Sequence, residues 1–454
     1  MKRLLFLAIT LAFALSAGAQ TPEAVLESIS KHPNHAYPEA AVYPGAPAEG
    51  VAVAPEGYEP FYFSLVGRHG SRYERSDKYF KRALGVFNKA SELGILTEEG
   101  KLLHKKIKEI YDAQQGNDGE LAPLGFEQWN EIAERAYNNF GKVFESGSIE
   151  AKSSVSLRCI FSMTSFTNAI KGKVPSIKIA QNARKSDLWI IRPLANDPAF
   201  TKEDKKIIAD AKKELGADEF CKEWEKNYDV STFISKVTTD PEAFVKKCGS
   251  DAPFMIARHT IISLLFGENF GHGDRELLTR LFTPKELYGL YIHQTSNWVN
   301  NSIGRGAEAV EAYQAYMRPM AEDILNKAQA AIDGKNPDVA NLRFTHDSYV
   351  GPIMSVLGYE GCVPQWNKDF ELAATSFNHG TVVPMAANLQ IVLYRNKQGK
   401  VLVRSLINER EAYLPIKSKT APFYTWKEFS DYINSNLKQL DASKEKVLKE
   451  FGKQ

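Results

Sequence analysis

The stretch Phe61–Tyr73, F-Y-F-S-L-V-G-R-H-G-S-R-Y, decides the fold. Its first part, Phe61–Val66, is mostly apolar and β-prone, and a glycine follows it, which is typical of a buried strand that ends there. Arg68, His69 and Arg72 come directly after this glycine. Ligands of open α/β sheets bind beyond the carboxyl ends of the strands. The stretch therefore predicts an α/β fold in which one strand carries a histidine and two arginines to a binding site.

The two arginines indicate what binds there. A guanidinium grips phosphate oxygens with a planar fork of N–H donors, and two guanidiniums this close repel each other unless an anion lies between them. Gly70 has no Cβ, so we expect a ligand to approach the backbone beside His69. The motif predicts a phosphate site with His69 at its centre. For the motif taken alone, an exposed turn is the alternative, and a second half of the site downstream argues against that alternative.

Residues 1–19 have the features of a signal peptide. A basic start, the apolar run Leu4–Leu15 and the small residues Ala17–Ala19 follow one another, and the apolar run is too short to span a bilayer. We expect cleavage after Ala19 and export, either to the periplasm or out of the cell. No later apolar run is long enough to cross a membrane, so the mature chain is predicted not to be membrane-bound.

Charge and cysteine content narrow the choice of function. The formal net charge is +2, and removal of Lys2 and Arg3 with the signal peptide brings it to 0, which argues against nucleic-acid binding by bulk charge. Hydrophobic residues make up 43% of the 454 residues, enough for a large core and for two domains. Export permits disulfides among the four cysteines, and we predict that Cys221 pairs with Cys248.

A second strand–histidine–helix unit lies far downstream. The predicted strand Asn341–Thr345 precedes the triplet His346–Ser348, H-D-S, and Tyr349–Leu357 then begins a predicted helix. This layout repeats that of the first motif. Because the carboxyl ends of parallel strands meet at one edge of a sheet, we expect His346 and Asp347 to join His69.

A third junction carries another arginine. A short segment, 148–154, is followed by a predicted helix, 155–169, and Arg158 lies in the first turn of that helix. If the junction ends at the same sheet edge, Arg158 joins the phosphate site, and the helix N-terminus adds positive potential there. The alternative is an ordinary surface arginine.

In the rest of the chain, helical spacing of apolar residues predicts helices, and short β-prone runs predict strands. Prolines interrupt residues 20–60, and we expect an irregular lead-in there. Residues 185–300 carry few strand signals, so we predict a helical cap inserted between two parts of an α/β core, 20–184 and 301–454. The closing helix is expected to cover 426–440, with a frayed tail after it. The other predicted helices are 76–92, 97–115, one from 121, and 319–332, and the other strands are 176–180, 389–394 and 401–406.

The predicted site has the chemistry for phosphate-ester hydrolysis without a metal ion or cofactor. Three arginines and His346 can hold the non-bridging oxygens of a phosphoryl group while His69 attacks phosphorus to form a covalent phosphohistidine. The positive cluster favours the neutral, nucleophilic form of His69. Asp347 can protonate the leaving alkoxide, and water then releases phosphate.

The sequence resembles the histidine acid phosphatases (branch 2 histidine phosphatases), and within them the exported bacterial relatives of multiple inositol polyphosphate phosphatase. The resemblance rests on R-H-G-S-R-Y at Arg68–Tyr73, S-L-R-C at Ser156–Cys159, H-D-S at His346–Ser348 and P-x-A-A-N-L at Pro384–Leu389. It implies a phosphoglycerate-mutase-like three-layer α/β core with a largely helical cap. It also implies hydrolysis of phosphomonoesters, with phytate and other inositol polyphosphates as substrates.

The resemblance also implies a role for each motif residue. His69 is the nucleophile and Asp347 the proton donor, and the phosphate clamp is formed by Arg68, Arg72, Arg158 and His346. Two positions depart from the family pattern. Tyr73 stands where proline is usual, which fits the inositol phosphatase branch, but Ser348 stands where that branch has the glutamate of H-A-E. The donor role therefore passes to Asp347. Arg75 either contacts further phosphates of the substrate or is exposed.

Different functions are compatible with parts of the sequence. No H-E-x-x-H, G-x-S-x-G or P-loop motif is present. A phosphoglycerate-mutase-like phosphotransferase fits the same core, but export argues against it. A broad-specificity acid phosphatase, or a catalytically silent, exported phosphate-ester-binding protein, would also fit the motifs.

We expect a monomer whose partner is a small-molecule phosphate ester. The remaining histidines are predicted to be ordinary surface or core residues: His32, His35, His104, His259, His272, His293 and His379.

Overall fold

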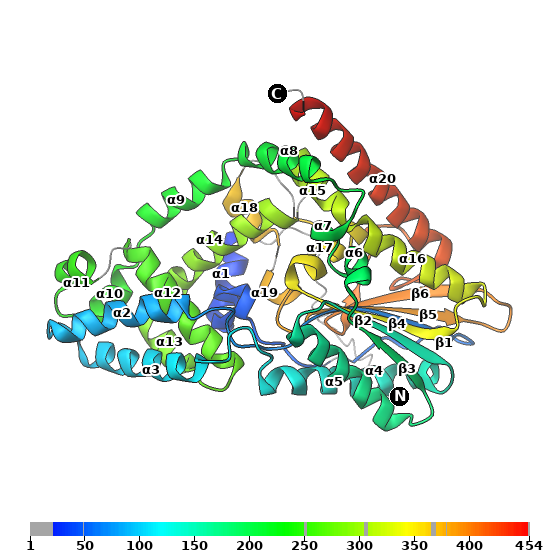
Figure 1. Cartoon of the computed structure of the whole chain (residues 1–454), viewed down its shortest axis with the longest axis horizontal. Helices are drawn as coiled ribbons and strands as arrows, with labels where there is room; N and C mark the ends of the chain where they lie inside the picture. The colour runs from blue at the N-terminus through cyan, green and yellow to red at the C-terminus, as the bar shows by residue number, and fades with distance from the viewer. Residues whose placement is uncertain are drawn as a thin grey trace, which may run out of the picture.

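The computed structural model describes residues 21–48, 50–248, 252–303, 307–364, 369–377 and 379–452. The predicted signal peptide, residues 1–19, lies outside these ranges. One mixed sheet forms the centre, helices cover its two faces, and a lobe of helices extends to one side of it (Figure 1). The predicted α/β class is confirmed.

The sheet is mixed, and the motif strand lies in its middle. Its strands are β1 (Glu59–Arg68), β2 (Ser148–Ser153), β3 (Lys178–Asn182), β4 (Asp338–Thr345), β5 (Asn388–Arg395), β6 (Val401–Ile407), β7 (Arg410–Ala412) and β8 (Phe423–Thr425). They run in the order β3-β2-β4-β1-β5-β6-β7, with β8 beside β6. The first four strands of this order are parallel to one another, and β5 begins the antiparallel part. β1 is therefore covered on both faces, which explains its continuous apolar run.

Hydrophobic clusters cover the two faces of the sheet. The covering helices are α4 (Pro123–Phe144) and α5 (Leu157–Lys173) on one face, and α16 (Arg318–Ile332), α17 (Asp347–Leu357) and α20 (Trp426–Phe451) on the other. Phe63 and Leu65 of β1 pack with Trp129 on the first face, whereas Tyr62 and Val66 pack with the second group. This alternation follows from the period of two in a strand. It produces the predicted three layers.

A third hydrophobic cluster lies in the lobe beside the sheet (Figure 1). The lobe helices are α1 (Pro22–Lys31), α2 (Lys78–Glu92), α3 (Glu98–Gln114), α10 (Ser231–Val237), α11 (Pro241–Cys248), α12 (Pro253–Asn269), α13 (Arg275–Leu281) and α14 (Pro284–Ser302). Phe80 and Phe87 of α2 share this cluster with Phe254 and Phe266 of α12. The lobe thus includes α2 and α3 as well as helices from the predicted cap, whose boundaries at 184 and 301 stay a prediction.

Short helices complete the described chain. They are the 3₁₀ turns η1 (Pro33–Ala36), η2 (Pro38–Ala40), η3 (Lys185–Asp187) and η4 (Ala315–Met317), and the α-helices α6 (Leu188–Ile191), α7 (Pro193–Asn196), α8 (Lys202–Lys213), α9 (Ala217–Asn227), α15 (Glu308–Gln314), α18 (Phe370–Thr375) and α19 (His379–Val382). Several of them link the lobe to the sheet side of the molecule.

Two segments are more helical than predicted. α1 lies in the lead-in that we expected to be irregular, because Pro22 sits in the first turn, where its missing N–H costs nothing, and Thr21 caps the helix. α20 continues past residue 440 to Phe451 instead of fraying. Val447 is buried against the core, and Lys446 pairs with Glu308 of α15. Tertiary contacts therefore hold both segments.

The predicted disulfide between Cys221 and Cys248 is wrong. All four cysteines are buried free thiols. The Cys221 thiol donates to the His293 carbonyl oxygen, and the Cys248 thiol donates to the Ala243 carbonyl oxygen. Within the described ranges, no helix combines the length and the apolar character needed to cross a membrane.

Candidate active site

The carboxyl ends of β1, β4 and β2 lie side by side at one edge of the sheet. Arg68, the last residue of β1, pairs with Thr345, the last residue of β4. His69 and His346 therefore leave neighbouring strands at the same level, and their ring centroids are 5.5 Å apart. The two strand–histidine units that the sequence predicts meet in space.

Side chains from α4 and α5 hold the backbone that follows β1. The Trp129 Nε1–H donates to the Arg68 carbonyl oxygen at 3.1 Å, and the Gly70 N–H donates to Ser162 Oγ at 3.0 Å. Both bonds are buried, where water cannot compete for the donors. They fix the direction in which His69 leaves the strand.

The absence of a side chain at Gly70 allows close backbone packing. A Cβ at Gly70 would lie 2.5 Å from the Gly125 carbonyl oxygen, and a Cβ at Gly125 would lie 2.3 Å from the Ser71 carbonyl oxygen. The two backbones are in direct contact, so the missing side chains make room for the start of α4. The Cβ direction of Gly70 is thus filled by Gly125, and approach of a ligand to the backbone beside His69 stays a prediction.

His69 is buried and uncharged. Burial, together with the positive charges of Arg68 and Arg158, lowers the pKa of its imidazole well below the usual value. Its Nδ1 is 3.0 Å from the Gly70 carbonyl oxygen, which can only accept, so Nδ1 carries the proton. Nε2 is then the nitrogen with the free lone pair, as a nucleophile requires.

Arg68 is the most firmly held arginine of the site, and it is fully buried. Its Nη1 donates to the Val383 carbonyl oxygen at 2.7 Å, and its Nη2 donates to the Glu39 carbonyl oxygen at 2.8 Å. Nη2 also forms an ion pair with Asp347 Oδ2 at 3.1 Å. Three partners from separate segments thus fix one guanidinium.

Arg72 and Arg158 complete the group that we call the arginine cluster, formed by Arg68, Arg72 and Arg158. Arg72 is buried, and its Nη1 donates to Glu74 Oε2 at 2.7 Å. Arg158 lies in the first turn of α5, as predicted, and its Nη2 donates to His346 Nδ1 at 3.4 Å. The surface alternative for Arg158 is therefore wrong.

The arginine cluster contains buried donors without an acceptor. In the part of the chain that the structure describes, the Nε atoms of Arg68, Arg72 and Arg158 are buried and have no hydrogen-bond partner. A buried donor left unpaired costs free energy. An anion with several acceptor oxygens, such as a phosphoryl group, would satisfy these donors together.

His346 is uncharged as well. Burial and the charge of Arg158 lower the pKa of its imidazole to about 3. Its Nδ1 accepts from Arg158, so Nε2 carries the proton and donates to Ser154 Oγ at 3.2 Å. The buried Cys159 Sγ lies 3.8 Å from both ring nitrogens. The ring is thus held from both sides.

Asp347 opens α17 and points to Arg68. Burial opposes ionisation of its carboxyl group, but the positive charges of Arg68 and Arg72 outweigh burial and hold the pKa well below its usual range. Its Oδ1 also accepts from the Ser348 N–H at 2.7 Å. Asp347 is therefore a carboxylate at any ordinary pH in this arrangement, and it must take up a proton before it can donate one.

Arg75 lies outside the arginine cluster. Its side chain is 61% exposed, and its closest carboxylate oxygens, from Glu39 and Glu74, are each 3.8 Å away. The structure thus places Arg75 at the rim, between the buried site and solvent.

Comparison with known proteins identifies the family. The sequence profile of the Histidine phosphatase superfamily (branch 2) matches residues 63–408. The chain belongs to this superfamily. No curated protein matches the sequence.

Solved structures of other histidine phosphatases have a similar fold. The multiple inositol polyphosphate phosphatase of Bifidobacterium longum in complex with inositol hexasulfate is 19% identical, with a TM-score of 0.63 over 87% of this chain and 97% of that chain. Its complex with phosphate gives a TM-score of 0.66 at 19% identity, covering 88% and 97%. The phytase from D. castellii is 15% identical, with a TM-score of 0.59, covering 89% and 85%. These likenesses confirm the predicted fold.

His379 is a buried core residue, one of the two outcomes that we predicted for it. Its ring lies on α19, stacked on Trp298 with centroids 4.1 Å apart. Burial lowers its pKa to about 3, and the charges that act on it are those of Asp347 and Arg68. No pattern around position 379 signals this, because the contact joins segments far apart in the chain.

Glu39 and Arg192 were missed. Glu39 lies in the proline-rich lead-in, yet its carbonyl oxygen binds Arg68. Arg192 lies between α6 and α7, its charge helps to lower the pKa of His346, and its Nε is buried with no partner among the described residues. Neither residue belongs to a motif, and only the fold brings them to the site.

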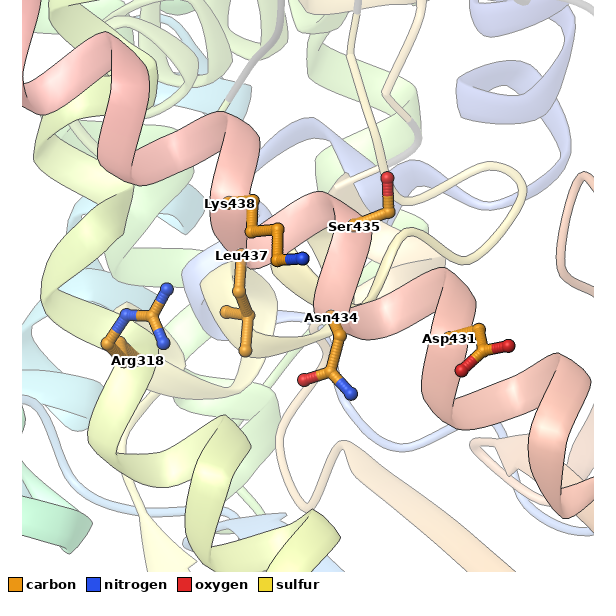
Figure 2. Close-up of a pocket in the computed structure, with 6 residues that line it drawn as sticks. All are labelled: Arg318, Asp431, Asn434, Ser435, Leu437 and Lys438. Atoms are coloured by element: carbon orange, nitrogen blue, oxygen red, sulfur yellow. The ribbon is translucent and has the colours of Figure 1, made fainter.

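A separate hollow lies between α16 and α20 (Figure 2). Its volume is about 490 Å³, and its lining residues are Arg318, Asp431, Asn434, Ser435, Leu437 and Lys438. The guanidinium of Arg318 is already paired with Asp441 and Glu322. No residue of the arginine cluster lines this hollow, and we assign no function to it.

Proposed function

We propose that this histidine phosphatase is an exported phosphomonoesterase that hydrolyses inositol polyphosphates such as phytate through a phosphohistidine on His69. The observation that carries the proposal is the pairing of an uncharged His69, whose Nε2 is free, with three arginines whose buried Nε donors lack acceptors. A nucleophile and an anion site thus share one sheet edge. In this proposal Arg68, Arg72, Arg158 and His346 bind the transferring phosphoryl group.

The reaction proceeds in two steps. His69 Nε2 attacks phosphorus in line, the N–P bond forms, and the P–O bond to the leaving group breaks. The arginine cluster stabilises the charge of the phosphoryl group as it moves. The leaving alkoxide takes a proton from Asp347. In the second step Asp347 accepts a proton from water, the water oxygen attacks phosphorus, and the N–P bond breaks to give inorganic phosphate and free His69.

Asp347 needs a source for its proton. The positive charges of Arg68 and Arg72 keep it ionised, but a bound phosphate ester would neutralise those charges and add negative charge beside the carboxylate, which raises the pKa. We therefore expect proton uptake on substrate binding and turnover that is favoured at acidic to neutral pH. A rate that keeps rising above about pH 9, far beyond ordinary carboxyl pKa values, would exclude Asp347 as the donor.

The inositol polyphosphate assignment rests on two supports. Arg75 and Arg192 add positive charge around the arginine cluster, where additional phosphates of one substrate would lie. The similar solved structures are phosphatases of this substrate class, and one of them holds inositol hexasulfate. A broad-specificity acid phosphatase would use His69 and the arginine cluster alone, and it would not need Arg75 and Arg192.

The test is release of inorganic phosphate from phytate by the mature chain in excess EDTA, compared with His69→Ala. We expect release by the parent and none by the variant, with no loss on chelation. If the parent cleaves p-nitrophenyl phosphate but not phytate, the mechanism stands and the substrate is wrong. Equal release by parent and variant would remove His69 as the nucleophile. Phytate binding without turnover by either would indicate a silent binding protein.

A further inference from the structure

Glu39 connects the catalytic edge of the sheet to the helical lobe. It lies on η2, and its side chain is 16% exposed. Its Oε1 accepts from Gln294 Nε2 of α14 at 2.8 Å, and its Oε2 accepts from the Tyr37 hydroxyl at 3.4 Å. Oε2 is also 3.8 Å from Arg75 Nη2. The carboxyl group therefore faces the rim of the site, while the carbonyl oxygen of the same residue binds Arg68.

Two carboxylates lie near the Arg75 guanidinium and offset its positive charge. Glu39 approaches its Nη2 and Glu74 approaches its Nε, each at 3.8 Å. Glu74 is also bound to Arg72 at 2.7 Å, so its charge is already compensated by a buried arginine. Glu39 has no second cation within ion-pair distance in the described ranges. The negative charge that competes most directly for Arg75 is that of Glu39.

We propose that Glu39 is a specificity-determining residue for polyphosphorylated substrates: its carboxylate occupies the position on Arg75 that a second substrate phosphate needs, so such a substrate binds when Glu39 is protonated. The inference rests on the proposed function and extends it from the transferring phosphate to its neighbours on the same substrate. A ligand with a single phosphate binds to the arginine cluster only, and the ion pair between Arg75 and Glu39 then stays intact.

Electrostatics support this role. Burial and the nearby charge of Asp347 raise the pKa of Glu39, so the group takes up a proton more readily than an exposed glutamate does. A polyanion placed beside the carboxylate raises that pKa further, because like charges disfavour ionisation. As pH rises through this pKa, Glu39 becomes charged and binding of the polyanion weakens. The titratable and charged groups that interact with Glu39 are Tyr37, Arg68, Arg72, Glu74, Arg75 and Asp347.

Glutamine at position 39 separates charge from structure. The variant Glu39→Gln keeps the backbone carbonyl that binds Arg68, and its side-chain oxygen can still accept from Gln294. The titratable charge is lost, and so is the acceptor for the long Tyr37 hydroxyl bond of 3.4 Å. Glu268→Gln is a matched control, because Glu268 is similarly buried, at 12% exposed, and pairs with Arg275 away from the arginine cluster.

The experiment measures binding by calorimetry in a His69→Ala background, where phytate cannot be turned over. Phytate and inorganic phosphate are titrated at pH 5 and pH 8. We expect Glu39→Gln to bind phytate about tenfold more tightly at pH 8, a factor that corresponds to about 1.4 kcal/mol, and less than threefold more tightly at pH 5. Inorganic phosphate should change less than threefold at both pH values, and Glu268→Gln should match the background.

Three results would overturn the inference. They are an unchanged phytate affinity at pH 8, an equal gain at both pH values, and an equal gain for inorganic phosphate.

Glu39→Asp keeps the charge and must not gain affinity at pH 8. Binding of inorganic phosphate reports that each variant is folded, and Glu39→Met, also neutral, replaces Glu39→Gln if that variant does not fold. Failure of the proposed function looks different: the His69→Ala background would bind inorganic phosphate but not phytate, and the inference would fall with its substrate.

Discussion

Arg68 and Arg75 belong to the same short segment, but their surroundings are opposite. Arg68 is fully buried and bound to Val383, Glu39 and Asp347, whereas Arg75 is 61% exposed with only loose carboxylate neighbours. A guanidinium held by several partners loses little freedom when an anion arrives, and an exposed one must be ordered at that moment. The difference teaches that, in the proposed function, the fold fixes the arginine that binds the transferring phosphate and leaves the outer arginine adaptable.

The largest expected effect tests the fixed arginine. Arg68→Gln should lower kcat by about 10³, in line with loss of a buried charge-stabilising donor. It should also lower the free energy of unfolding by about 3 kcal/mol, because Asp347 and two carbonyl oxygens lose their partner. Phosphate release and thermal unfolding measure the two effects. A folded variant with parental kcat would show that burial does not mark the catalytic arginine.

Asp347→Asn comes next. We expect kcat to fall by about 10² to 10³ through loss of a general acid. The parent rate should decline as pH rises, because the donor must be protonated, and the variant should lack that decline. A pH profile of kcat measures this. A variant that keeps the alkaline decline would assign it to another group, for which Glu39, whose pKa is raised, is the nearby candidate.

The same substitution has a stability effect whose pH dependence has a definite sign. The pKa of Asp347 is lowered in the folded state, so its ion pair stabilises the fold above the unfolded-state value of about 3.9, and this contribution is lost as pH falls below that value. Asp347→Asn should therefore lower the unfolding temperature at pH 7, and the gap should narrow as pH falls toward about 3. A gap that stays constant would contradict the ion pair with Arg68.

Arg158→Ala tests an arginine of intermediate character. It is partly buried, and its contacts to His346 and Gly119 are 3.4 and 3.5 Å long. We expect kcat to fall about tenfold to a hundredfold, less than for Arg68, since a half-exposed donor is partly replaced by water. The pKa of His346 should rise at the same time, because Arg158 lowers it. NMR titration of the histidines measures that shift, and an unchanged His346 would contradict the contact.

Arg75→Ala should have the smallest effect. We expect KM for phytate to rise about threefold to tenfold with kcat unchanged, since an exposed ion pair contributes about 0 to 1 kcal/mol and somewhat more when two charges meet a polyanion. Cleavage of p-nitrophenyl phosphate should not change. Steady-state kinetics on both substrates provide the check. A drop in kcat on p-nitrophenyl phosphate would place Arg75 with the fixed arginines instead.

The sequence predicted the sheet and its catalytic edge because the signals there are local. Phe61–Val66 has the composition of a buried strand and is followed within three residues by His69, and the predicted strand Asn341–Thr345 is followed directly by His346. Both lie inside the strands that the structure contains, β1 and β4, and their ends are in register. The parallel pairing of β1 with β4 brings His69 and His346 together, and the parallel pairing of β2 with β4 adds Arg158 from the start of α5.

What the sequence did not reveal depends on contacts between distant segments. The end of α20 is held by tertiary packing, which no local pattern displays. The signals that begin α1, Thr21 and Pro22, are local, but they lie in a lead-in whose other prolines predict irregular structure. The disulfide prediction failed because sequence spacing says nothing about the direction of two thiols on separate helices. Glu39 and His379 come to the site from a proline-rich lead-in and from a short helix. Asp347 was predicted as an acid, but its depressed pKa follows from the position of Arg68, which only the structure shows.

The contact between Gly70 and Gly125 has a consequence for how the protein folds. The two backbones touch so closely that neither glycine could carry a side chain. The R-H-G-S segment therefore cannot take its final course until the start of α4 has docked against it. We expect the anion site to form late in refolding, after the sheet has collapsed onto α4, so that mutations at this contact mainly speed unfolding and change the folding rate little.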